Sequence, residues 1–171
     1  MISYRIDLRL AFPSGFTKRQ MEDIKRQAIQ EAAEAWHKEF LEKHFKPAAR
    51  GEYDYQPRKD KYQQAKIRAV ARGKAEAAFD LVFSGETKRL AMQRPLIRAF
   101  PTRARIDLLT PAYIDMRSRQ DRPPMGDEMT RVTYQESRDL SEKMMKVCER
   151  LIAEGLDNNE NTQFFAKYVL D

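Results

Sequence analysis

Two histidines and a single cysteine are the side chains of this sequence best suited to bind a metal or to act as a nucleophile. His37 and His44 are seven residues apart in a segment with a helical pattern, so they fall on roughly one face, two turns apart. A zinc site needs closer spacing and further ligands. Cys148 is far away in the sequence and falls in an apolar helical stripe. We therefore expect exposed helix histidines, a buried Cys148, and no metal or other cofactor.

The motifs of common catalytic sites are missing. The sequence contains neither G-x-x-x-x-G-K-[ST] nor G-x-G-x-x-G, the glycine-rich loops that hold phosphates. The segment Phe83-Ser84-Gly85-Glu86 lacks the first glycine of a nucleophile elbow. Asp and Glu are frequent, but no pair stands out, and a nuclease site with clustered carboxylates around Mg²⁺ stays open as an alternative. This pattern favours a protein that is not an enzyme.

The composition fits one domain with a densely charged surface. Of 171 residues, 42% are hydrophobic and 34% are charged, and the net charge is +6. A basic balance is typical of proteins that bind polyanions or acidic partners, but Lys, Arg, Asp and Glu are mixed almost everywhere, as on an ordinary solvated surface. The sequence lacks a signal-peptide pattern and an apolar run of membrane-spanning length, so we expect a cytoplasmic protein without a membrane partner.

The first half of the chain alternates between clear strand and helix patterns. Strict period-two alternation over residues 2–10 predicts a half-buried strand. A capping box at Thr17 and a long apolar stripe predict a helix from about residue 18 to 45. Proline and glycine make residues 46–60 a loop, and residues 61–72 suit a short helix.

The second half reads as a meander followed by a helix. Residues 86–92 suit a short strand or a helical turn, and two strands around Pro101-Thr102, over 96–100 and 103–109, predict an antiparallel meander. A second capping box begins at Thr133 and opens another amphipathic helix, which Gly155 is placed to end.

These elements predict an α+β fold, in which a long N-terminal helix and a C-terminal helix pack on a small antiparallel β-sheet with extended loops. Residues 1–171 form a single domain. A polar segment with two prolines and a glycine predicts a protruding loop near 115–130. A C-terminal tail is expected over 156–171, and its apolar part, Phe164 to Leu170, can dock on this domain or on a neighbour.

One stretch of the sequence resembles a known family. It contains a helix ending in Trp and Phe, a Tyr-x-Tyr-x-x-Arg loop, a Tyr-x-x-x-Lys turn, and an apolar strand leading into Ser-Gly. The residues are Trp36, Phe40, Tyr53, Tyr55, Arg58, Tyr62, Lys66 and Leu81 to Thr87. Over roughly residues 30–115 this arrangement is similar to the neck, tail-completion and minor tail proteins of tailed bacteriophages. It departs from the family at Thr87, where leucine is usual.

The resemblance implies a structural subunit of the virion, assembled in the host cytoplasm. It would join the portal or adaptor proteins on the head side to the tail proteins, in a ring of its own copies around the DNA channel and close to genomic DNA. Tyr and Arg are favoured at interfaces, because each combines a large contact area with a hydrogen-bonding end. The interface candidates are Tyr53, Tyr55, Arg58, Tyr62, Arg117, Arg119 and Arg122. The alternative for the tyrosines is that they pack the loop onto its own domain.

A basic nucleic-acid-binding module is the second hypothesis. Its basis is the net charge of +6, with Arg98, Arg103 and Arg105 on or beside the meander. Such a module should lose affinity steeply as the salt concentration rises, whereas a ring subunit should form a defined multimer, alone or beside its partners.

Overall fold

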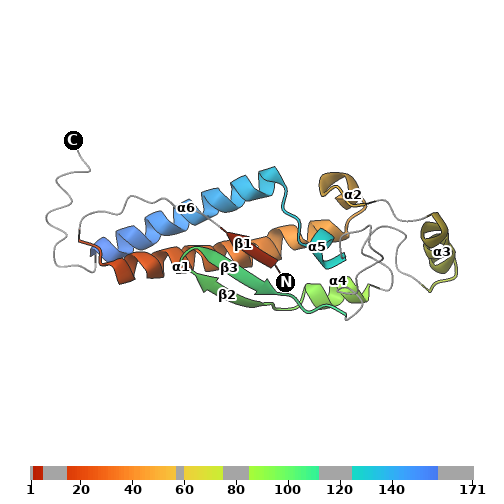
Figure 1. Ribbon diagram of the computed structural model, residues 1–171, viewed down its shortest axis with the longest axis horizontal. Helices are drawn as coiled ribbons and strands as arrows, with labels where there is room; N and C mark the ends of the chain where they lie inside the picture. Colours follow the sequence, from red (N-terminus) through yellow and green to blue (C-terminus); the bar gives the residue numbers. More distant parts are fainter. Residues whose placement is uncertain (1, 6–14, 57–59, 75–84, 112–124, 158–171) are drawn as a thin grey trace.

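The computed structural model describes residues 2–5, 15–56, 60–74, 85–111 and 125–157 (Figure 1). The predicted α+β class is confirmed, with a long N-terminal helix beside a small antiparallel sheet. The elements in chain order are β1 (Ile2–Arg5), α1 (Lys18–Ala35), a π-helical turn (Trp36–Phe40), a 3-10 turn (Leu41–Phe45), α2 (Ala49–Glu52), α3 (Asp60–Ala71), α4 (Glu86–Ala91), β2 (Leu96–Phe100), β3 (Arg103–Asp107), α5 (Met125–Met129) and α6 (Tyr134–Asp157).

Helix α1 begins at the predicted capping box. The Thr17 hydroxyl accepts a hydrogen bond from Gln20 N at 3.3 Å, and Gln20 Oε1 accepts one from Thr17 N at 2.8 Å. The predicted single helix over 18–45 is helical throughout, but its winding changes after Ala35 to a π turn and then to a 3-10 turn. This change brings Trp36, Phe40, Leu41 and Phe45 into the interior together, where a regular helix would present a narrower stripe.

Helix α6 runs antiparallel to α1 and packs along it (Figure 1). Cys148 is fully buried against Ile24 and Ala28, as predicted. The prediction that Gly155 ends the helix is wrong, because α6 continues to Asp157. A Cβ atom on Gly155 would lie 3.1 Å from the Phe16 ring. Glycine at this position therefore lets the segment before α1 approach α6 closely.

The sheet has the strand order β1-β3-β2, and both pairings are antiparallel. The predicted β2–β3 hairpin is confirmed, with Ile97 opposite Ile106 and Arg98 opposite Arg105. Ala104 and Ile106 on the inner face are buried against α1. Residues 86–92 form a helix, α4, rather than a strand. Residues 6–10 of the first predicted strand and the apolar run 78–83 lie outside the described residues.

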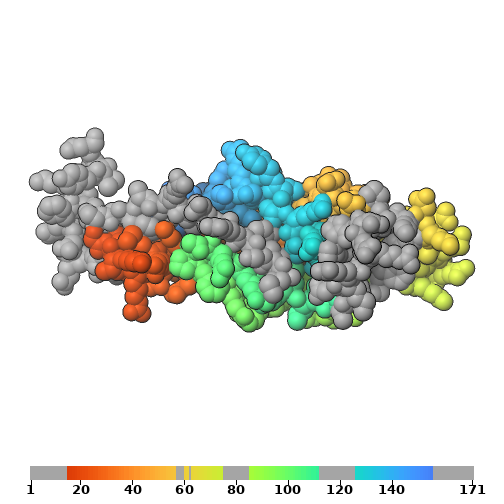
Figure 2. Space-filling model, in the orientation of Figure 1, coloured from red at the N-terminus to blue at the C-terminus, as the bar shows by residue number. Residues whose placement is uncertain are grey.

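The overall shape is elongated, with the sheet, α1 and α6 forming one body and α3 at one end (Figure 1). On the face shown in Figure 2, residues of β2 and β3 lie at the surface in green. The predicted loop near 115–130 is helical from Met125 to Met129, where α5 lies, and its earlier part is outside the described residues. The predicted tail begins within α6, and residues 158–171 are not described.

We expect Ile106→Ala to lower the free energy of unfolding by about 2–5 kcal/mol, because the side chain is fully buried between the sheet and α1. Urea denaturation measures this. The matched control is Leu109→Ala, at a side chain that is 51% exposed, where a change within about 0.5 kcal/mol is expected. Equal losses in the two variants would contradict the described core.

Candidate functional site

An aromatic cluster surrounds His44 where the α1 segment ends. The His44 ring stacks on Tyr53, with ring centroids 3.7 Å apart and planes at 19°, and Trp36 meets it edge-on at 6.2 Å. His44 Nδ1 and Tyr55 Oη share a hydrogen bond of 2.5 Å. The prediction of exposed histidines is wrong, because His44 is fully buried and His37 is only 9% exposed, with its Nε2 at 2.9 Å from the Ala91 carbonyl oxygen.

Burial makes His44 a neutral structural side chain. It lowers the pKa of His44 to about 4. A hydrogen-bonding interaction with the Arg131 backbone partly opposes this effect, and the charge of Lys43 adds to the lowering. Within the described part of the chain, the buried Nε2 of His44 makes no hydrogen bond of normal geometry. Because no part of the ring is exposed, a substrate has no access to it, and the ring works by packing.

Tyr53 links the loop after α2 to the start of α6. Its hydroxyl donates to Glu136 Oε1 at 2.5 Å, while the other oxygen, Oε2, accepts from Thr133 N at 3.0 Å. Lys43 Nζ lies 3.9 Å from Glu136 Oε1. Burial, and next the hydrogen bond to Glu136, raise the pKa of Tyr53, so the hydroxyl stays a donor. The glutamate of the predicted capping box thus serves a long-range contact as well as the helix end.

The segment between α5 and α6 holds the same loop from the other side. The Arg131 guanidinium donates to the carbonyl oxygen of Tyr53 at 2.9 Å and to that of Asp54. Asp54 has a φ of 51°, a left-handed conformation that an aspartate tolerates in turns. Gln56 N donates to Oε1 of the fully buried Glu128 at 3.1 Å. The loop over 53–56 is therefore fixed by residues more than seventy positions away.

Two of the predicted interface tyrosines do not lie on the surface. Tyr53 and Tyr55 are each 3% exposed and belong to the core, so for these two the alternative stated above is the correct one. The physical reason is that their hydroxyl groups find buried partners in Glu136 and His44. Lys66 of the same pattern is also buried. Arg58, Arg117, Arg119, Arg122 and the side chain of Tyr62 lie outside the described residues.

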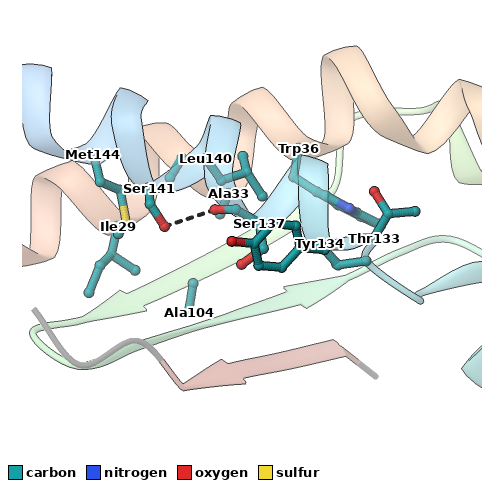
Figure 3. A pocket seen from close by; sticks show the side chains of 12 residues that line it. Ile29, Ala33, Trp36, Ala104, Thr133, Tyr134, Ser137, Leu140, Ser141 and Met144 are labelled. Carbon is teal, nitrogen blue, oxygen red and sulfur yellow. Dashed lines mark hydrogen bonds between the residues drawn. The ribbon is translucent and has the colours of Figure 1, made fainter.

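A hollow of about 350 Å³ opens between α1, the first half of α6 and β3 (Figure 3). Its walls are mainly apolar, and it is bordered by Tyr134, which is 86% exposed. The lining residues are Ile29, Ala32, Ala33, Trp36, Ala104, Val132, Thr133, Tyr134, Ser137, Leu140, Ser141 and Met144. The sequence analysis did not predict this surface. The available signal was Tyr134 followed by Ser137 and Ser141, at three- and four-residue spacing, which places small side chains on one face of the helix.

The hydroxyl groups around the hollow serve helix α6. Ser141 Oγ donates to the Ser137 carbonyl oxygen at 2.8 Å (dashed in Figure 3), and Thr133 Oγ1 accepts from Glu136 N at 3.2 Å. No charged side chain is among the described residues that line the hollow. The arrangement therefore suits the packing of an apolar group better than proton transfer or nucleophilic attack.

The three meander arginines share the outer face of the sheet. Arg98 lies opposite Arg105, and Phe100 lies opposite Arg103. Residues directly opposite in an antiparallel pair point to the same side. Arg105 Nε donates to Asp107 Oδ1 at 2.8 Å. The structure thus brings together the residues on which the nucleic-acid hypothesis was based.

Within the described part of the chain, no three His, Cys, Asp or Glu side chains gather in a way that could hold a metal ion. None of the helices described here combines the length and the apolar character needed to cross a bilayer. Comparison with known proteins adds no relative, since neither a family model, nor a curated protein, nor a solved structure matches the chain.

The pKa of His44 predicts a pH dependence of stability. Between pH 6.5 and 4 the unfolded chain binds a proton that the folded protein does not, so stability falls as the pH is lowered through this window, by up to about 3 kcal/mol. The contribution is constant above pH 6.5. Chemical denaturation of the wild type and of His44→Gln at several pH values should show the difference between them shrinking on acidification. His37→Gln, which keeps His44, should still lose that stability, and an unchanged slope in His44→Gln would contradict the assignment.

Removing the Tyr53 hydroxyl should destabilise the fold. In Tyr53→Phe the buried Glu136 loses its 2.5 Å donor, and an unsatisfied buried acceptor costs about 1–3 kcal/mol. Tyr134→Phe makes the same chemical change at an 86% exposed side chain and should leave the midpoint of unfolding unchanged. If both variants unfold like the wild type, Tyr53 does not hold the loop to α6.

Proposed function

We propose that this chain is a non-enzymatic structural subunit of the neck of a tailed bacteriophage. It assembles in a ring with its own copies and joins the portal side of the head to the tail around the DNA channel. The observation that carries the proposal is the apolar hollow between α1, α6 and β3 beside the exposed Tyr134. The place in the virion comes from the resemblance over residues 30–115.

The hollow fits a side chain from a protein partner. Its volume of about 350 Å³ is at the lower end of the range of roughly 300–1,000 Å³ typical of small-molecule pockets. Its described walls carry no charged group that would orient a polar ligand. Apolar pockets flanked by an exposed aromatic residue are the usual centres of protein interfaces, since burial of such a residue contributes much of the binding energy.

The buried network supports a role in presenting surfaces. His44, Tyr53, Glu136 and Arg131 connect the α1 end, the loop after α2 and the start of α6 through hydrogen bonds and stacking. Tyr134 directly follows the Thr133 cap of the same helix end. Its position is therefore tied to the core, which reduces the entropy lost when a partner binds.

Filling the hollow should prevent assembly. Ser141→Trp places an indole where the partner's side chain would enter. The variant protein should therefore have the mass of a monomer in solution, or it should fail to join portal-side and tail-side proteins that capture the wild type. Native mass spectrometry of the full chain, alone and with those proteins, measures this.

Two further variants complete the design. Tyr134→Ala should weaken the same association, and Lys146→Trp, at an exposed position of α6 outside the hollow, should behave like the wild type. Circular dichroism confirms that each variant is folded. A wild-type chain that stays monomeric and joins neither set of partners would sink the proposal.

A further inference from the structure

The outer face of the sheet carries an ordered set of arginines. Across the β2–β3 ladder, Arg98 faces Arg105 and Phe100 faces Arg103, while the intervening Ala104 and Ile106 are buried against α1. Arg98 and Arg103 are exposed, and the Arg105 side chain is 39% exposed. Three positive charges therefore share one small surface that faces away from the helices.

The protein neutralises only part of this charge. Asp107 pairs with Arg105, but within the described residues no carboxylate forms an ion pair with Arg98 or Arg103. Like charges directly opposite each other destabilise a sheet. A face that holds Arg98 opposite Arg105 at this cost is complementary to an anionic partner.

Aromatic and aliphatic groups lie among the arginines. The Arg103 guanidinium lies 5.1 Å from the Phe100 ring centroid, in a cation–π arrangement, and Phe100 remains 43% exposed. Leu96 on the same face is 53% exposed. Arginine guanidinium groups contact the phosphate oxygens that position a protein on a duplex. A protein partner would need a carboxylate for each unpaired arginine, whereas a phosphate backbone supplies charges in a row.

We propose that the outer face of β2 and β3, through Arg98, Arg103 and Arg105, binds the phosphate backbone of duplex DNA without sequence specificity. The choice of duplex DNA among polyanions rests on the proposed function, in which the subunit surrounds a DNA channel. The contact is electrostatic and independent of base sequence, because the arginines contact phosphates and not base edges.

The test is binding of the full chain to a fluorescein-labelled duplex of mixed sequence, followed by anisotropy over a series of salt concentrations. The double variant Arg98→Ala/Arg103→Ala should bind more weakly. The slope of log Kobs against log salt concentration should become less negative by about 2, since each lost phosphate contact removes about 0.9. The control is Arg19→Ala/Arg72→Ala, with the same net charge, at two exposed arginines in the first turn of α1 and just after α3.

Three results would overturn the proposal: no binding by the wild type, equal losses in the two double variants, or a sheet variant that loses self-association while it keeps DNA binding. The third result would assign this face to a protein partner. The DNA-binding test and the assembly test can fail independently of each other. Loss of assembly in Ser141→Trp with DNA binding intact supports both, whereas a wild type that assembles without binding DNA sinks only this inference.

Discussion

The burial of helix α1 from two directions is the constraint on which the other elements depend. Ile29 and Ala33 contact the core that contains the inner face of the sheet, while Ile24 and Ala28 pack against Cys148 of α6. Small alanine side chains on both sides allow α1 to approach its neighbours closely. The sheet of the described residues has three short strands, and packing of its inner face against α1 supports it. Its outer face can therefore remain open to solvent, because the inner face already supplies the core.

Buried polar groups define the other end of the molecule. Glu128 and Glu136 are almost fully buried, and carboxylates are costly to remove from water unless they are hydrogen-bonded. The donors to these carboxylates come from the loop over 53–56 and from the cap of α6. Movement of the loop would therefore break hydrogen bonds to buried carboxylates. The hollow and the arginine face lie on opposite sides of β3, since Ala104 lines the first and Arg103 and Arg105 belong to the second. The apolar hollow and the charged face are therefore separate surfaces of the molecule.

Local patterns predicted the elements well and the burial of polar aromatic residues poorly. Both capping boxes, the β2–β3 hairpin and the environment of Cys148 follow from spacing within a few residues. The inward orientation of His44 and Tyr53 depends on contacts with partners such as Glu136, 83 residues from Tyr53, and on the π turn after Ala35. Tyrosine and histidine occur both on wet surfaces and in hydrogen-bonded interiors. The sequence therefore left interface and core open for the tyrosines, and its prediction of exposed histidines was wrong. The hollow depends on how α6 lies against α1, which no local pattern specifies.

Strand β2 is an edge of the sheet and is bracketed by proline on both sides, with Pro95 before Leu96 and Pro101 after Phe100. Proline has no N–H to offer to a neighbouring strand, and the charge of Arg98 at the centre of the strand repels another copy of itself. The β2 edge of the sheet is thereby protected from pairing with a further strand. An unprotected strand edge is a template for aggregation, so the residues that flank and occupy β2 lower the risk of aggregation through this side of the molecule.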